Sequence, residues 1–293
     1  MKIKSDSLNG ELVTFLASDN VILHGFLVKS KKKSNKVIIH LHGLTGNFYR
    51  SFLIGPLARK FISNGYNFFS INLRGHDTVA DVKKKEGKKL NRLTIGTAYE
   101  KFEDCIYDIE GAIKFVLKKG FFNIFLEGHS TGCQKITYYQ CKKQDKKVKG
   151  LILLAPAEDY IYQKKFLGEK FEKSVKIAKK LINKRNVLMP KWCYGGLISA
   201  KRYWSLVNTK SNESRLFDYN LKRLNLFSKV RCPILAVFGT KEQYAVKPVK
   251  EYLRILKTNT KSPEFDGILI SGANHSFENH EKELANMIVK WLK

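Results

Sequence analysis

A serine lies between two glycines where a strand pattern changes into a helix pattern. The segment Gly128-His129-Ser130-Thr131-Gly132 follows the apolar run 123–126. A serine at the apex of a sharp strand-to-helix turn exposes its hydroxyl as a nucleophile. The positions two residues to either side must be small, because a Cβ atom there would collide with the crossing strand and helix. We therefore predict that Ser130 is the nucleophile of a covalent mechanism.

A serine hydroxyl is a weak nucleophile and needs a base, and the base needs a partner that fixes its tautomer. The predicted strand 234–238 runs into Glu242, and the predicted strand 268–270 runs into His275. These residues follow Ser130 in the order nucleophile, acid, histidine. We predict that His275 is the general base and that Glu242 is the acid that orients it.

Other residues near these positions leave alternatives open. Glu158 or Asp159, just past the preceding predicted strand, could take the place of the acid. His280 is a weaker alternative for the base and is expected at the start of the last helix. His129 and His76 are expected to pack in their turns rather than to titrate.

Strands alternate with helices along most of the chain, which predicts an α/β protein with a mostly parallel central sheet and helices on both faces. An N-terminal hairpin is expected from strands 12–17 and 21–28. The further strands are expected at 37–41, 67–73, 123–126, 151–156, 233–239 and 267–271. The helices are expected at about 52–63, 99–118, from the elbow to 142, 246–257 and 280–292. The lysine-rich segment 78–98 is expected to be a loop.

The alternation breaks in the middle of the chain, which divides it into a core at 1–156 and 231–293 and a helical cap insertion at 157–230. A helix is expected near 171–184, because apolar residues recur there at helical spacing. This face would pack on the core and cover a pocket; the alternative is a basic surface against an anionic membrane. Four aromatic residues could line that pocket or fill the core of the cap: Trp192, Tyr194, Tyr203 and Trp204.

The composition is that of a globular protein, with 293 residues of which 43% are hydrophobic and 27% charged. The formal net charge is +28. The basic residues are mostly lysines spread along the whole chain, whereas specific nucleic-acid readers rely on arginine and on a localised patch. We expect a solvated lysine-rich surface and no specific nucleic-acid site.

Several signals for other protein classes are missing from the sequence. The five cysteines form no C-x-x-C pair, which predicts buried, reduced thiols. Residues 1–6 lack the apolar core of a signal peptide, and no apolar run reaches the ~20 residues of a transmembrane helix, so a cytoplasmic location is expected. The spacing of His and Asp predicts no metal site, and phosphate-binding glycine motifs are missing, so no cofactor is expected.

Together these motifs resemble the α/β-hydrolase superfamily, especially its small carboxylesterases and serine-aminopeptidase-like lipases. The stretch 42–47 (His-Gly-Leu-Thr-Gly-Asn) is particularly similar to that of feruloyl esterases. The resemblance covers nearly the whole chain outside the insertion and implies the α/β-hydrolase fold. The shared pieces are the N-terminal hairpin, His42–Gly46, Leu73–His76, the elbow, Pro233–Glu242 and Gly272–His275. Glu242 departs from the pattern, since the superfamily has Asp at this position more often.

The resemblance also implies an oxyanion hole, in which two backbone N–H groups hold the developing negative charge. Thr131, directly after the nucleophile, and Leu44, after His42-Gly43, are expected to supply them. Gly43 would allow the backbone to approach the substrate closely.

The expected function is a serine hydrolase that cleaves a carboxylic ester of a small molecule through an acyl-enzyme on Ser130. The same triad would also serve a thioesterase, an acyltransferase or a peptidase. A non-catalytic, ligand-binding relative is a further alternative. The sequence leaves the substrate and the oligomeric state open.

Overall fold

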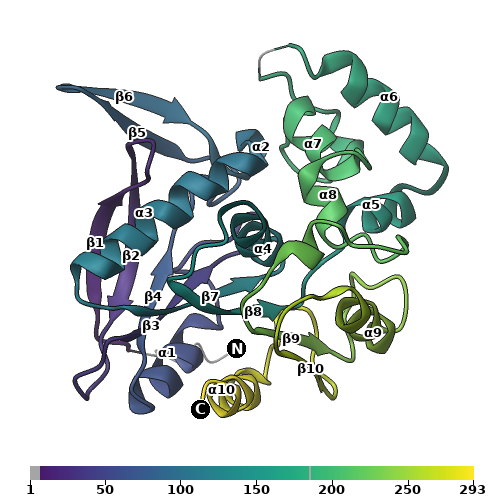
Figure 1. Cartoon of the computed structure of the whole chain (residues 1–293). Helices are drawn as coiled ribbons and strands as arrows, with labels where there is room; N and C mark the ends of the chain where they lie inside the picture. Colours follow the sequence, from purple (N-terminus) through teal and green to yellow (C-terminus); the bar gives the residue numbers. More distant parts are fainter. Residues whose placement is uncertain (1–6, 185) are drawn as a thin grey trace.

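The computed structural model describes residues 7–184 and 186–293 (Figure 1). Residues 1–6, on which the expectation about a signal peptide rested, lie outside this range. Within the described residues, ten strands form one sheet in the order β10-β9-β8-β7-β3-β4-β2-β5-β6, with β1 paired to β2. The strands are β1 (Glu11–Leu16), β2 (Val21–Val28), β3 (Lys36–Leu41), β4 (Asn67–Ile71), β5 (Asp81–Glu86), β6 (Lys89–Thr94), β7 (Asn123–His129), β8 (Val148–Leu154), β9 (Ile234–Gly239) and β10 (Phe265–Ile270).

The part of the sheet from β4 to β10 is parallel, and its N-terminal edge is antiparallel. The α-helices are α1 (Ile54–Ser63), α2 (Gly96–Tyr99), α3 (Cys105–Lys118), α4 (Thr131–Lys143), α5 (Asp159–Leu167), α6 (Phe171–Leu181), α7 (Ala200–Val207), α8 (Asn212–Leu216), α9 (Val249–Asn259) and α10 (Glu281–Trp291). Short 3₁₀ turns lie at η1 (Phe102–Asp104), η2 (Gly168–Lys170), η3 (Lys191–Cys193) and η4 (Phe227–Lys229).

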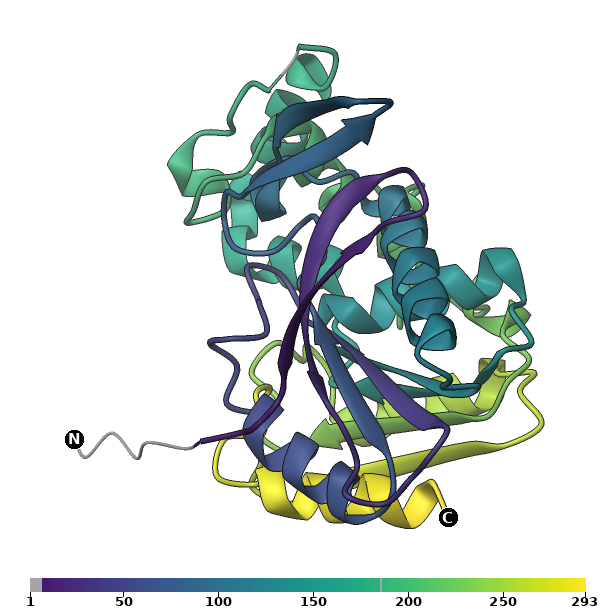
Figure 2. The ribbon, with the colours of Figure 1, turned by 90° about the vertical axis from the view of Figure 1, so that its left-hand side faces the viewer.

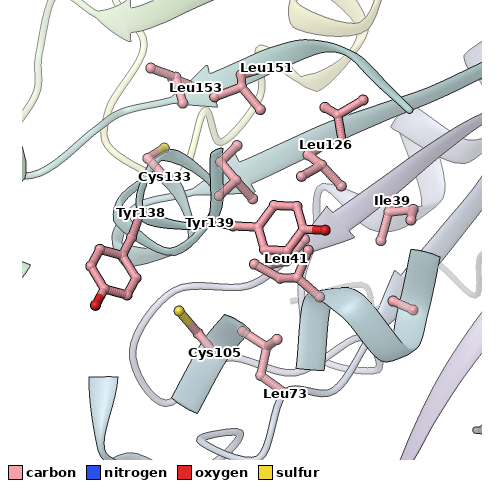
Figure 3. Packing of buried hydrophobic residues seen from close by; sticks show 14 of the residues in the cluster. Ile39, Leu41, Leu73, Cys105, Leu126, Cys133, Tyr138, Tyr139, Leu151 and Leu153 are labelled. Carbon is pink, nitrogen blue, oxygen red and sulfur yellow. The ribbon is translucent and has the colours of Figure 1, made fainter. Parts of the chain in front are cut away.

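Helices cover both faces of the sheet, which confirms the predicted fold class. Residues of α1 and α10 pack on one face, and residues of α3, α4 and α9 pack on the other (Figure 1). Figure 3 shows the second of these layers, where Cys133 and Tyr139 of α4 lie over Leu41 and Leu151 of the sheet. Strands that are buried on both faces are mostly apolar. This explains the hydrophobic runs Val37–Ile39 in β3 and Leu151–Leu154 in β8.

The predicted loop at 78–98 is wrong. It contains the hairpin β5–β6, which turns at Gly87 (φ 61°), followed by α2. Figure 2 shows this hairpin extending from the edge of the sheet. Val82 faces Leu93 across the hairpin and is buried, and β5 pairs with the edge of β2. Lysine is depleted in β-strands on average. Pairing with the edge of β2 nevertheless stabilises the lysine-rich segment β5 as a strand.

The predicted helix 99–118 starts too early. Glu100 and Lys101 have extended backbone, with ψ of 143° and 120°, so α2 is separated from η1 and α3. The other predicted elements of the core match observed ones within a few residues. Gly65 (φ 83°) and Gly120 (φ 86°) follow the C-termini of α1 and α3. The sequence indicated both glycines as helix ends.

The segment 157–230 is mainly helical and contributes to two hydrophobic clusters. Residues from Leu167 to Val207 form a cluster of their own, whereas Leu216 to Val230 pack in the cluster that covers the sheet face under α4. The division into a core and a 157–230 cap stays a prediction. Tyr203 lies in the core of this helical segment, Trp204 packs against it, and Trp192 is exposed.

The cysteines are unpaired thiols; four are buried, and Cys232 is partly exposed. Across the described ranges, no helix has the length and apolar character needed to cross a bilayer. The described side chains also form no group of three or more His, Cys, Asp or Glu that could hold a metal ion.

Candidate active site

Ser130 occupies the turn between β7 and α4 with a strained backbone. Its φ of 55° and ψ of −126° are unusual for a residue with a side chain. Its N–H donates to the carbonyl of Leu154 on β8 (2.9 Å), which holds the turn against the sheet. A Cβ at Gly128 would collide with the backbone of Gly132, and a Cβ at Gly132 would collide with the Leu41 carbonyl. Both glycines are therefore required by the tight crossing of strand and helix.

His275 and Glu242 meet beyond the ends of β10 and β9, two parallel neighbours in the sheet. Nδ1 of His275 lies 2.9 Å from Oε1 and 2.9 Å from Oε2 of Glu242. The ring is almost fully buried. Because a carboxylate only accepts, Nδ1 carries a proton, and in the neutral imidazole Nε2 then has the lone pair.

The backbone of His275 is held on both sides. Its N–H donates to Oε1 of Gln243 (2.9 Å). Its carbonyl accepts from Nε2 of His129 (2.9 Å), the residue before the nucleophile. Burial and the neighbouring His275 lower the pKa of His129 to about 3, so the ring stays neutral and acts as a donor. His129 thus packs in the turn without titrating, but it also ties the elbow to the histidine loop.

The other sequence candidates contact different partners. Glu158 accepts from Asn220 (3.1 Å), and Asp159 accepts from Gln134 (3.0 Å). His280 precedes α10 and its Nδ1 lies 3.1 Å from Glu283. Glu242 is therefore the candidate carboxylate that the structure brings to His275.

A cavity of about 750 Å³ lies at this end of the sheet. Ser130 and His275 both line it, as do Gly43 and Leu44 of the loop after β3. A Cβ at Gly43 would lie 2.8 Å from Cβ and 3.2 Å from Oγ of Ser130. The backbone of this loop therefore passes directly beside the nucleophile.

His42 fixes the orientation of the Gly43–Leu44 peptide. Its Nδ1 donates to the Gly43 carbonyl (2.7 Å), and its Nε2 accepts from the N–H of Leu73 (3.1 Å). Burial lowers the pKa of His42 to about 3, so the ring keeps this neutral tautomer. A trans peptide is planar, so fixing the Gly43 carbonyl makes the Leu44 N–H point the opposite way.

The rest of the loop is tied to the neighbouring turn by Asp77. Its carboxylate accepts from Asn47 (2.7 Å), Tyr49 (2.5 Å) and Arg50 (2.6 Å). His76 also contacts Asp77, which places it in this turn rather than at Ser130. No local sequence pattern indicates this role of Asp77, because its partners are brought together only by the fold.

The aromatic lining differs in part from the prediction. Tyr194 lines the cavity as one of the expected residues. Tyr162, Phe166 and Tyr244, which were not singled out from the sequence, also line it. The Tyr244 ring packs edge-on against the His275 ring with a centroid distance of 4.5 Å. These residues give the cavity an apolar wall beside the imidazole.

Several esterases and lipases share the fold of this chain. Est1E from Butyrivibrio proteoclasticus with bound ferulic acid aligns with a TM-score of 0.68 and 18% identity, over 96% of this chain and 98% of that one. The esterase Pf2001 from Pyrococcus furiosus aligns with a TM-score of 0.61 and 17% identity, over 97% and 90%. A monoglyceride lipase from Saccharomyces cerevisiae aligns with a TM-score of 0.68 and 16% identity, over 99% and 97%.

A comparison with curated proteins found no match for the sequence. The solved structures share the α/β-hydrolase fold with this chain. Residues 96–293, more than half of the chain, match the family model described as "Protein of unknown function (DUF1749)", and the chain therefore belongs to that family.

Proposed function

We propose that the protein is a serine hydrolase that cleaves carboxylic esters through an acyl-enzyme on Ser130. One observation carries the proposal. The serine at the positive-φ apex and the imidazole held by Glu242 line the same cavity. The fold shared with esterases and lipases supports this reaction class.

In the proposed reaction, Nε2 of His275 takes the proton of Ser130 as Oγ attacks the acyl carbon. The carbonyl oxygen becomes negative and accepts from the N–H groups of Leu44 and Thr131. Glu242 stabilises the imidazolium. The C–O bond then breaks, and the alcohol leaves with the proton from His275. Water, activated by the same imidazole, attacks the acyl-enzyme and releases the acid and Ser130.

Three features of the site support these roles. The strained turn places Ser130 in the wall of the cavity. His42 orients the peptide whose N–H would stabilise the oxyanion. Thr131 is the first residue of α4, and the N-terminus of a helix favours negative charge.

The test is hydrolysis of an ester panel by the whole protein and by Ser130→Ala. The panel holds short- and long-chain p-nitrophenyl esters, a feruloyl ester and a monoacylglycerol, since solved structures of similar fold are those of an esterase with ferulic acid and a monoglyceride lipase. Acyl-CoA thioesters and aminoacyl anilides are added to separate a thioesterase or a peptidase, and an alcohol acceptor reveals acyl transfer. We expect ester cleavage that falls by at least ~10³-fold in Ser130→Ala. Unchanged cleavage in that variant would contradict the proposal, and tight ester binding without turnover would favour a non-catalytic binding protein.

A further inference from the structure

One face of α5 forms a wall of the cavity beside Ser130. Asp159, Tyr162, Gln163 and Phe166 follow one another at helical spacing (i, i+3, i+4, i+7), and all four line the cavity. Phe166 is half exposed, whereas Gln163 is 6% exposed. The wall therefore presents the carboxyl group of Asp159 and the amide of Gln163 near its inner end, and the Phe166 ring at the surface.

The carboxyl group of this wall is bound by the helix that begins at the nucleophile. Nε2 of Gln134 donates to Oδ2 of Asp159 (3.0 Å) and to the carbonyl of Ala157 (2.9 Å). Gln134 stands four residues after Ser130 at the start of α4, which is about 6 Å along a helix. Ser130 and Asp159 line the same cavity, so one bound substrate can contact both residues.

The surroundings of this wall are rich in carboxyl groups, although the chain as a whole is strongly basic. Among the described residues that line the cavity, Glu158 and Asp159 are acidic, and the basic Arg50 is already paired with Asp77. Burial and the charge of Glu213 raise the pKa of Asp159 to about 7. A positive charge bound in the cavity beside Asp159 would therefore favour the ionised form of its carboxyl group.

The charges of the nearby cations Arg202 and Lys135 lower the pKa of Asp159, but burial and Glu213 outweigh them. Both cations are paired with other carboxylates. Arg202 pairs with Glu213 (2.5 Å) and lies 3.2 Å from Glu100. Lys135 pairs with Glu100 (2.8 Å). All four groups are buried. Two buried cations thus face two buried carboxylates, and the carboxyl group of Asp159 is additional to this balanced set.

Gln163 gives an independent sign of a missing donor. Its Oε1 is buried and has no hydrogen-bond partner among the described residues, although the residue lines the cavity. An unpaired buried acceptor is costly, so a ligand that brings an N–H donor would be favoured there. A primary ammonium group carries both a positive charge and three donors. The rings of Tyr162 and Tyr194 line the same cavity and favour a nearby cation.

We propose that Asp159 and Gln163 form a subsite for a primary ammonium group carried by the ester substrate. The ammonium group donates to the carboxylate of Asp159 and to Oε1 of Gln163, and its aliphatic stem lies along the aromatic wall. The inference rests on the proposed function, because the ester group of the same molecule reacts at Ser130. It narrows the substrate class to esters that bear an amine in the acyl or the alcohol part.

The test compares esters that differ only in the exchange of an ammonium group for a methyl group. Methyl 6-aminohexanoate and methyl heptanoate place the difference in the acyl part, and 6-aminohexyl acetate and heptyl acetate place it in the alcohol part. At pH 8, we expect the ammonium ester of at least one pair to have a kcat/KM about tenfold or more above that of its neutral partner. A ratio near or below one in both pairs would overturn the proposal.

Variants test whether the preference for ammonium esters depends on Asp159 and Gln163. Asp159→Asn keeps an oxygen acceptor for Gln134 but removes the charge, and it should lower the ammonium-to-methyl ratio by about ten- to hundredfold. Gln163→Leu should lower the ratio by a smaller factor. The matched control is Glu169→Gln, which removes one carboxylate from the exposed turn η2, and its ratio should equal that of the wild type. A wild-type ratio in Asp159→Asn would overturn the assignment.

Binding to Ser130→Ala separates failure of this inference from failure of the proposed function. Calorimetry with this variant measures binding of the paired esters without any need for turnover. Tighter binding of the ammonium ester, lost in the Ser130→Ala/Asp159→Asn double variant, would support the subsite even if the wild type cleaves no ester. Equal binding of the paired esters, together with ester cleavage that needs Ser130, would overturn the subsite alone.

Discussion

Both carboxylate oxygens of Glu242 lie 2.9 Å from Nδ1 of His275. This contact holds the neutral imidazole in one tautomer, in which Nε2 is the ring nitrogen that can accept a proton. A glutamate is less common than an aspartate at this position in the superfamily that the sequence resembles. The contact here shows that the longer side chain reaches the ring from the loop after β9.

Glu242→Gln should lower kcat by roughly 10³-fold or more, because the amide can hold the imidazole in the wrong tautomer and cannot stabilise the imidazolium. Glu242→Asp should lose less, because the charge is kept but the side chain is shorter. Steady-state ester hydrolysis measures both. The matched comparison is Glu158→Gln, and a larger loss in that variant than in Glu242→Gln would move the acid to the end of β8.

His129→Leu should lower kcat by about tenfold with little change in KM, since it removes the hydrogen bond that holds the His275 carbonyl. The expected cause is misplacement of the base rather than loss of substrate binding. Separate kcat and KM values, together with thermal unfolding, decide between these effects. A lower melting temperature with an unchanged kcat would show a purely structural role for His129.

Two glycine substitutions should separate activity from folding. In Gly43→Ala the new methyl group would press on Cβ and Oγ of Ser130, so activity should fall by about 10²-fold or more in a folded protein. In Gly128→Ala the methyl group would meet the backbone of Gly132 and Cys133, so the fold itself should be destabilised. Circular dichroism and urea unfolding measure stability beside the ester assay. A fully active Gly43→Ala enzyme would mean that the loop does not approach the nucleophile as described.

Glu158→Gln should stabilise the protein at high pH. Burial, the charge of Asp218 and a hydrogen bond to Asp218 raise the pKa of Glu158 to about 8. Between the ordinary pKa of a glutamate and about 8, the folded protein keeps a proton that the unfolded chain has lost. Stability from this group is therefore present at low pH and falls as the pH rises through that window.

Glutamine imitates the protonated acid, because its oxygen can still accept from Asn220 and its amide can donate to Asp218. The variant should match the wild type at pH 4 and exceed it at pH 9 by on the order of 1–3 kcal/mol in the free energy of unfolding. Urea unfolding at both pH values measures the difference. A parallel pH dependence of the two proteins would refute the raised pKa.

The elements that could be predicted are those whose signal is local. The apolar runs of β3 and β8 and the small residues around Ser130 reflect burial and a tight crossing, so periodicity and turn chemistry identify them. The β5–β6 hairpin was missed, because its strand character comes from pairing with the edge of β2 rather than from its lysines.

The candidate site shows the same distinction. The positions of Ser130, Glu242 and His275 could be predicted because each follows a recognisable strand. The supporting contact of His129 spans 146 residues of sequence, and that of His42 with Leu73 spans 31. Such pairs carry no periodic or local signal. His42 and Leu73 follow the neighbouring strands β3 and β4, whereas the loop after β10 contacts His129 at the end of β7, three places away in the sheet.

Covalent labelling with a fluorophosphonate, followed by mass spectrometry of the peptides, tests the central claim most directly. The proposed mechanism predicts a single phosphonyl adduct on Ser130 of the folded wild-type protein, with slower labelling in Glu242→Gln and none at this position in Ser130→Ala. A folded wild-type protein that stays unlabelled, or whose adduct maps to another residue, would contradict the proposal that Ser130 is an activated nucleophile.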